Sequence, residues 1–295
     1  MNPEQQSPAA PSQRFTFDRT ADVSKLEGCN TRGVGYRWDI FKRHLEKLPI
    51  GAALDFGAGS LRDSFELAVH GFRVTAIDID LATLAAYRAR YVWPNDALPE
   101  LVAGPDLLKN LALLAGRKFS LITCFDVLEH LADPVAALRA LAAHLDHDGL
   151  LFVTVPNGRS LFEIVWRIDL MLARATGRVL TPGEPHLQRN SPAKWKRLIR
   201  DAGLSILEHD IQIGFFANTS AALIQVPLAM IGRVARKSGI KLDAIGLADR
   251  IIDGPQASVM DFLDRHTSSF LKPLYAWNLF VLAKTQHTGG NSARQ

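Results

Sequence analysis

The stretch ALDFGAGS at residues 53–60, followed by RVTAID at residues 73–78, decides the fold. The first apolar run predicts a buried strand that enters a glycine turn, and the second predicts a strand that ends in the acid Asp78. Gly57 and Gly59 lack a Cβ, so the backbone can turn sharply there and come close to a ligand. The helix expected after the turn would point free backbone N–H groups at the same place.

The unit also indicates which kind of ligand it holds. A carboxylate at the end of the second strand, Asp78, can accept both hydroxyls of a ribose. The dinucleotide fingerprint requires glycine or alanine three residues after the second glycine, where this sequence has Arg62. Asp55, before the first glycine, also lies outside that fingerprint. The pattern favours another nucleotide-like cofactor, and a tight turn that binds nothing is the alternative that this motif alone leaves open.

Three blocks together resemble the class I S-adenosylmethionine (SAM) methyltransferases. Residues 55–61 resemble the acid-x-Gly-x-Gly-x-Gly motif, with Leu61 at the third glycine position. Residues 119–134, FSLITCFDVLEHLADP, resemble the fourth strand and the segment after it, with Ser120 in place of the usual acid. Residues 149–157, GLLFVTVPN, resemble the fifth strand. The resemblance is closest to the branch that includes ubiquinone-biosynthesis O-methyltransferases and natural-product enzymes.

The resemblance covers about residues 30–213 and the final strand, and it implies the fold. We expect an α/β protein with a Rossmann-like seven-stranded sheet, its last strand antiparallel, and helical insertions. Helix starts are predicted at Asp80, at Asp133-Pro134 and at Ser191-Pro192 by capping residues. The expected organisation is a disordered tail (1–15), an N-terminal helical cap (16–48), a SAM methyltransferase domain (49–285) with insertions at 161–190 and 214–276, and a flexible tail (286–295).

The resemblance implies S-adenosylmethionine as the cofactor and assigns residues to it. The methionine part is expected at the glycine turn, the ribose at Asp78 and the adenine at Asp106. Capping of the following helix is an equally good interpretation of Asp106. The expected cofactor-binding residues are Asp55, Gly57, Gly59, Asp78, Ile79, Asp106, Leu107 and Cys124.

Two histidines are candidate catalytic bases, because an oxygen nucleophile must lose its proton and imidazole titrates near neutrality. His130 follows the strand that ends beside the methyl group in similar enzymes, and His186 lies where similar enzymes carry a histidine facing the acceptor. Packing or capping of the loop is the alternative for His130, and a solvated loop position is the alternative for His186. Arg189, close to His186, could hold an acidic group.

Asp126, Glu129 and His130 stand at i, i+3 and i+4, so they would share one face of a helical turn. Ubiquinone-type enzymes carry a Glu-x-x-Glu-His arrangement there that has been linked to a divalent metal, and Asp126 replaces its first glutamate. Ordinary capping and ion-pair roles are the favoured interpretation, and we assign no metal ligand.

Composition limits the remaining choices. The net charge of +4 is mild, and no Lys/Arg-rich run suggests nucleic-acid binding. The two cysteines, Cys29 and Cys124, lie far apart and predict no disulfide framework, which fits a cytoplasmic protein. No transmembrane helix is expected. The apolar insertions are expected to bury against the core or across a homodimer, and peripheral contact with a membrane is the alternative.

The favoured function is SAM-dependent O-methylation of a small or lipid-like hydroxylated acceptor. A non-catalytic, methyltransferase-like partner subunit is the alternative, and Leu61 at the third glycine position is its only support. A nucleotide-sugar or NAD-dependent enzyme is disfavoured by Arg62 and by the lack of a Tyr-x-x-x-Lys pair. The identity of the acceptor cannot be inferred, because fold and motifs do not specify it.

Overall fold

The computed structural model describes the core of the chain, namely residues 41, 44–45, 47–94, 97–160, 163, 167, 186–212, 231, 238, 262–263, 266 and 278–286. The predicted tails, most of the predicted N-terminal cap and most of both predicted insertions lie outside these residues. The predicted domain boundaries therefore stay predictions.

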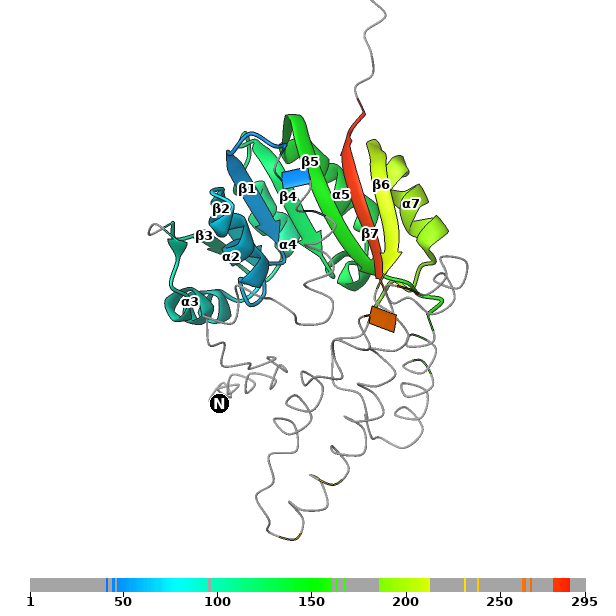
Figure 1. Cartoon of the computed structure of the whole chain (residues 1–295), viewed down its shortest axis with the longest axis horizontal. Coiled ribbons are helices and arrows are strands. Elements are labelled where there is room, and N and C mark those ends of the chain that lie inside the picture. The colour runs from blue at the N-terminus through cyan, green and yellow to red at the C-terminus, as the bar shows by residue number, and fades with distance from the viewer. Residues whose placement is uncertain are drawn as a thin grey trace, which may run out of the picture.

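In the described part of the chain, seven strands form one sheet in the order β3-β2-β1-β4-β5-β7-β6 (Figure 1). Strands β1 to β5 run parallel to one another, whereas β7 is antiparallel to both β5 and β6. This confirms the predicted Rossmann-like sheet with an antiparallel last strand. The strands are β1 (Ala52–Phe56), β2 (Arg73–Asp78), β3 (Glu100–Ala103), β4 (Phe119–Phe125), β5 (Leu145–Pro156), β6 (Leu204–Gln212) and β7 (Asn278–Thr285).

Helices connect the strands and cover both faces of the sheet. Asp80 caps α3 by accepting the N–H groups of Ala82 and Thr83, as predicted. Asp133 and Ser191 cap α5 and α7 in the same way, each followed by proline at the first helical position. The helical elements are α2 (Arg62–Val69), α3 (Leu81–Arg90), α4 (Leu107–Ala112), the 3₁₀ turn η3 (Leu128–His130), α5 (Pro134–His144) and α7 (Pro192–Asp201).

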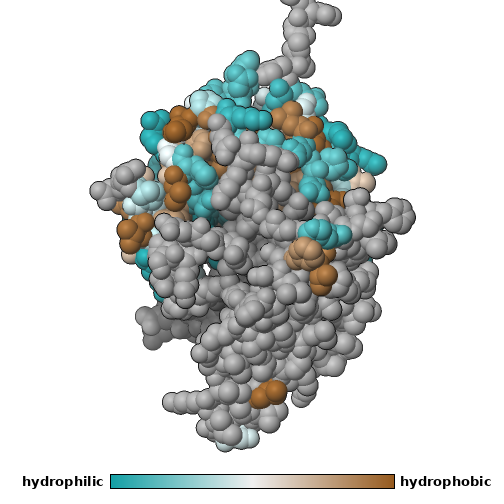
Figure 2. All heavy atoms as spheres, viewed as in Figure 1, coloured by the Kyte–Doolittle hydropathy of each residue, from teal (hydrophilic) through white to brown (hydrophobic). Residues whose placement is uncertain are grey.

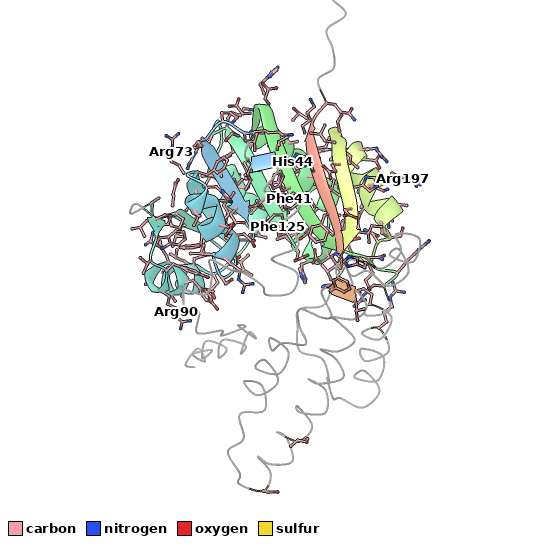
Figure 3. All side chains as sticks on the ribbon, in the orientation of Figure 1. Phe41, His44, Arg73, Arg90, Phe125 and Arg197 are labelled. Atoms are coloured by element: carbon pink, nitrogen blue, oxygen red, sulfur yellow. The ribbon has the colours of Figure 1, made fainter. Side chains whose placement is uncertain are left out.

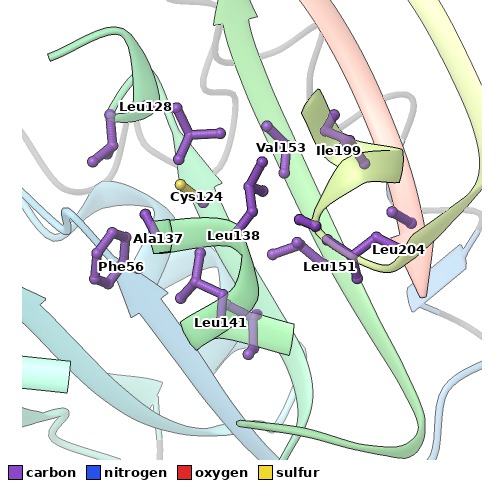
Figure 4. Close-up of a cluster of buried hydrophobic side chains, with 14 of the residues drawn as sticks. Phe56, Cys124, Leu128, Ala137, Leu138, Leu141, Leu151, Val153, Ile199 and Leu204 are labelled. Carbon is purple, nitrogen blue, oxygen red and sulfur yellow. The ribbon is translucent and has the colours of Figure 1, made fainter. Parts of the chain in front are cut away.

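The core has two layers because alternate residues of a strand point to opposite faces. Leu54 of β1 belongs to the layer beneath α4, α5 and α7, while its neighbour Ala53 belongs to the layer beneath α2 and α3. Figure 4 shows the first layer, in which Leu138 of α5 and Ile199 of α7 face Leu151 on β5. Burial on both faces explains why the central strands are nearly continuous apolar runs.

Phe41 anchors the helical residues 41 and 44–45 to the second layer of the sheet (Figure 3). Its fully buried ring stacks on Phe152 of β5 at a centroid distance of 4.0 Å and on Phe125 of β4 at 5.5 Å. One turn later, His44 Nε2 lies 2.8 Å from Glu208 Oε2 on β6. This chain segment therefore covers the middle of the sheet, on the same face as α2 and α3.

No helix among the described residues is long and apolar enough to cross a membrane. The predicted cytoplasmic location and the predicted membrane contact both stay predictions.

We predict that Phe41→Ala lowers the free energy of unfolding by about 3–5 kcal/mol, because it removes a buried ring and leaves a cavity over the sheet. Urea unfolding followed by circular dichroism measures the change. The control is Val69→Ala at the end of α2, where the side chain is 52% exposed and the expected change is about 0.5 kcal/mol or less. Similar small losses in both variants would contradict the packing described here.

Candidate active site

The candidate site lies where the order of the strands reverses. From β1 the chain builds outward through β2 to β3, and it then crosses back to place β4 on the other side of β1. Ligands of open parallel sheets bind at the carboxyl ends of the strands beside such a reversal. The glycine turn after β1 and the segment after β4 both lie there, so the topology brings together the first two motif blocks.

The glycine turn is tied to the end of β2. Gly57 and Gly59 have φ angles of +82° and +48°, in the left-handed region that glycine tolerates best. The N–H groups of Gly57 and Ala58 donate to the Ile77 carbonyl at 2.8 and 2.9 Å. The N–H of Gly59 donates to Oδ2 of Asp78 at 2.7 Å. The predicted ribose-binding acid therefore also holds the glycine turn in place.

The two glycines face different surroundings. A Cβ on Gly57 would lie 2.2 Å from Cγ2 of Val127, so protein fills the space beside that residue. A Cβ on Gly59 would meet only the Gly57 carbonyl oxygen, at 4.0 Å. The turn is thus packed on one side and open on the other. An open glycine is what the close approach of a cofactor to the backbone requires, so the turn fits S-adenosylmethionine.

Leu61 takes the backbone conformation that glycine would supply at the third motif position. Its φ and ψ are 57° and 17°, and its side chain is fully buried in the layer beneath α2. A left-handed conformation costs a residue with a side chain roughly 1–2 kcal/mol, which burial of the leucine can offset. Leucine at the third motif position is therefore compatible with the left-handed backbone that a glycine would adopt there.

Asp78 has the acceptor capacity that a ribose needs. Its Oδ2 accepts from Gly59 and its Oδ1 accepts from the N–H of Ile79 at 2.6 Å. A carboxylate oxygen can accept two hydrogen bonds, so each oxygen keeps capacity for one hydroxyl. The N–H of Ile79 is engaged by Asp78. The predicted contact of Ile79 with the cofactor would therefore be made by its side chain or its carbonyl.

Asp106 caps α4, the alternative that the sequence left open. Its Oδ1 accepts the N–H groups of Leu108 and Lys109 at 2.9 and 3.1 Å, and Oδ2 takes part in neither bond. Asn110, which the sequence did not single out, donates to the carbonyls of Asp78 at 3.0 Å and Gly104 at 2.9 Å. This amide brings the start of α4, including the predicted residue Leu107, beside the end of β2.

Asp55 and Cys124 lie inside the core. Asp55 accepts hydrogen bonds from the hydroxyls of Ser64 on α2, at 2.6 Å, and Thr123 on β4, at 2.9 Å. Burial raises the pKa of Asp55 to about 7. Burial also raises the pKa of the Cys124 thiol, so this thiol is a poor nucleophile. The predicted contacts of both residues with the cofactor stay predictions.

The structure brings the two predicted bases together. His130 ends η3, directly after β4, and its ring centroid lies 5.1 Å from that of His186, with the two rings nearly perpendicular. His130 Nε2 is 3.8 Å from Oε1 of the buried Glu129. His186 Nδ1 is 2.8 Å from Oε1 of Glu163, a fully buried carboxylate that the sequence reasoning missed.

Backbone hydrogen bonds hold the segment of His186 between the ends of β4 and β5. The N–H of Gln188 donates to the Glu129 carbonyl at 2.9 Å, and the N–H of Gly158 donates to the Asn190 carbonyl at 3.0 Å. A Cβ on Gly158 would lie 2.4 Å from the backbone of Arg189, so only glycine allows this close packing. No local sequence pattern signals these contacts, because they join residues far apart in the chain.

Glu129, His130 and His186 could also hold a metal ion. Each offers one ligand atom, and these atoms lie within 4.8 Å of one another. One carboxylate and two imidazoles suit zinc or another divalent transition metal. Asp126, the third residue of the triad considered from sequence, lies outside this group. Its φ is 56°, η3 begins only at Leu128, and its Oδ1 accepts from the Thr154 hydroxyl at 3.0 Å.

Residues 39–209, which contain the glycine turn and both histidines, match a family model described as a methyltransferase domain. The chain belongs to this methyltransferase family. The family assignment confirms the predicted enzyme class and S-adenosylmethionine as its cofactor. Which residues of this chain contact the cofactor or the acceptor stays a prediction.

Curated relatives are ubiquinone biosynthesis O-methyltransferases. The chain is 29% identical over 160 residues to that of Xanthomonas axonopodis pv. citri, which covers 54% of this chain and 64% of the relative. It is 26% identical over 194 residues to that of Marinobacter nauticus, which covers 62% of this chain and 71% of the relative. The chain thus spans less than two thirds of the length of the first relative.

A solved structure supports the fold. A SAM-dependent methyltransferase from Archaeoglobus fulgidus matches with a TM-score of 0.51 and 13% identity, covering 89% of this chain and 98% of that one. At this identity the likeness concerns the fold alone.

We predict that Asp55→Asn changes how stability depends on pH. Between about pH 4 and pH 7 the unfolded chain ionises this carboxyl while the folded chain keeps its proton, because the pKa is raised from 3.8 to about 7. The wild type should therefore lose stability relative to Asp55→Asn as pH rises through this window, and the difference should level off above it. Thermal unfolding from pH 4.5 to 8.5 measures this, with Asp133→Asn on the surface as the control. A difference in Tm that does not vary with pH would contradict the prediction.

Proposed function

We propose that this chain transfers the methyl group of S-adenosylmethionine to an oxygen of a small or lipid-like hydroxylated acceptor. The observation that carries the proposal is the pair His130 and His186, two imidazoles 5.1 Å apart at the sheet edge that also holds the glycine turn. A methyl acceptor with an O–H group needs a proton acceptor at this place. The names of the curated relatives, which are O-methyltransferases, support oxygen as the acceptor atom.

The cofactor would lie along the carboxyl ends of β1 and β2. Asp78 would accept the ribose hydroxyls, the open face of Gly59 would receive the methionine part, and Oδ2 of Asp106 would meet the adenine amino group. Ile79 and Leu107 would flank these groups. When bound, S-adenosylmethionine supplies a methyl group on a sulfonium, and a neutral thioether is its leaving group.

The residues of the chain would position the two reactants and supply an imidazole that accepts the proton. Most of the rate of such a displacement comes from holding the two reactants in line. An imidazole takes up the hydroxyl proton while the oxygen forms its bond to carbon, and it later returns this proton to water. Imidazole suits the role because its ordinary pKa lies near neutral pH.

The alternative of a non-catalytic partner subunit loses its support. That interpretation rested only on Leu61, which stands at the third glycine position of the motif. The loop keeps a glycine-like backbone at this position, and the leucine side chain points into the core. The hydrogen bond from the N–H of Gly59 to Oδ2 of Asp78 supports a cofactor site at this turn.

A lipid-like acceptor is favoured by the apolar character of the second insertion. The described surface shows separate apolar areas among hydrophilic ones (Figure 2). Three of the exposed large apolar side chains belong to this insertion, namely Ile231, Phe262 and Leu263. Such side chains can contact an acceptor chain, a membrane surface or a second copy of the protein.

We predict that Asp78→Ala weakens binding of S-adenosylmethionine about 100-fold or more, since it removes two charge-assisted hydrogen bonds to the ribose. Isothermal titration calorimetry measures the affinity. The control is Asp80→Ala, which removes the cap of α3 two residues later and should cost only about 1 kcal/mol of stability. Equal affinities of Asp78→Ala and wild type would refute the ribose assignment.

We predict methylation of at least one of three probes: 3,4-dihydroxybenzoate, a decyl-substituted catechol in detergent micelles, and glucose. Release of S-adenosylhomocysteine is the measurement. His130→Gln and His186→Gln are made separately, and loss of the base should lower kcat about 10²–10⁴-fold. The control is His147→Gln, whose side chain is 76% exposed outside the site. No turnover of any hydroxyl by the wild type, or full activity of both site variants, would contradict the proposal.

A further inference from the structure

Glu163 lies just beyond β5 and is held rigidly. Its backbone N–H donates to Oγ of Ser160 at 3.3 Å, the geometry of a capped helix start, and its side chain has no exposed surface. Oε1 contacts Nδ1 of His186 at 2.8 Å, and Oε2 accepts from Nε of Arg189 at 3.1 Å. Both carboxylate oxygens are thus engaged, each by a different side chain from the last residues of the first insertion, shortly before α7.

These contacts determine which nitrogen of His186 carries the proton. Oε2 of Glu163 pairs with the guanidinium of Arg189, and the carboxylate of such an ion pair can only accept hydrogen bonds. Nδ1 of His186 must therefore be the donor. In a neutral imidazole the other nitrogen, Nε2, is then an acceptor. The catalytic histidine of serine hydrolases is held in the same way, since a buried carboxylate accepts from its Nδ1–H and fixes the tautomer.

Carboxylates and a guanidinium surround the two imidazoles. Glu163 and Arg189 compensate each other, while the buried carboxylate of Glu129 faces His130 at 3.8 Å. With both carboxylates ionised, these groups carry one net negative charge. One further positive charge at these side chains would therefore make the whole group neutral.

We propose that Glu163 is a positioning residue, which holds His186 with Nδ1 protonated so that Nε2 takes the hydroxyl proton of the acceptor. The proposal rests on the methyl transfer proposed above. The O–H bond of the acceptor breaks, its proton bonds to Nε2, and the oxygen's electron pair forms the new bond to the methyl carbon. The sulfur keeps the electron pair of the broken S–C bond. The products are a methyl ether, the thioether and an imidazolium, which releases its proton to water.

The tautomer can be measured without cofactor or activity. The full chain is labelled with ¹⁵N-histidine, and the His186 signals are identified by their loss in His186→Gln. Long-range ¹H–¹⁵N correlation spectra at neutral pH should show Nδ1 protonated in the wild type. In Glu163→Gln the amide oxygen should stay with Arg189 and the NH₂ group should face Nδ1, so the proton should move to Nε2. A wild-type His186 protonated on Nε2 would overturn the proposal.

The chain offers a matched control for this substitution. Glu208 on β6 also pairs with a histidine, since its Oε2 lies 2.8 Å from Nε2 of His44, far along the sheet from His186. Glu208→Gln removes a similar Glu–His contact, so it should leave the His186 spectrum and the kinetics unchanged. Calorimetric titration with S-adenosylmethionine should give wild-type affinity for both glutamine variants, which establishes that they are folded.

Kinetics separate positioning from a merely structural role. Glu163→Gln should lower kcat about 100-fold for a catechol, with little change in KM, because the base is lost and not the binding. It should have little effect on 4-nitrocatechol above neutral pH, because that hydroxyl is already ionised and needs no base. Equal losses for both acceptors would overturn the proposal. If the wild type binds S-adenosylmethionine but methylates neither catechol, the proposed function fails for this class, while the tautomer still tests the role of Glu163.

Discussion

The reversal of strand order between β1 and β4 is the constraint on which the site depends. β1 is hydrogen-bonded on both sides, with Leu54 in register with Thr75 of β2 and Ile122 of β4. All three strands therefore end at one edge, and the glycine turn and η3 leave the sheet side by side. The apolar layers on both faces fix the strands and therefore the geometry of this edge.

Local signals predicted much of the fold. Apolar runs located the strands, and Asp80 and Ser191 marked helix starts through contacts only two or three residues away. The left-handed backbone at Leu61 and Asp126 could not be predicted in this way, because leucine rarely adopts positive φ, and aspartate tolerates it better but does not require it. At these positions the surrounding packing and hydrogen bonds select the conformation. Both lie at the carboxyl edge of the sheet, where such strain is often found.

The candidate site was predictable only in part, for a related reason. The glycine turn and Asp78 belong to one strand–turn–helix–strand unit that the motif describes, so their association follows from the sequence pattern. Glu163 and His186 are 23 residues apart, and no periodicity relates a buried acid after β5 to a loop histidine. The motif resemblance assigned Asp55 to the cofactor, and that contact stays a prediction. The hydrogen bonds of Asp55 to Ser64 on α2 and Thr123 on β4 were not predicted, because they join residues that no local pattern relates.

The proposed site of the methyl donor and the proposed base belong to different parts of the chain. The proposed donor site lies at the sheet edge, while Glu163 and His186 lie near the two ends of the first insertion. In-line transfer requires that the reacting atoms approach to about 3–3.5 Å, so the two parts need a rigid link. The backbone bonds from Gln188 to Glu129 and from Gly158 to Asn190 supply that link. The middle of the insertion can therefore vary without displacing the proposed base, because backbone hydrogen bonds fasten the end that carries His186 to the segments after β4 and β5.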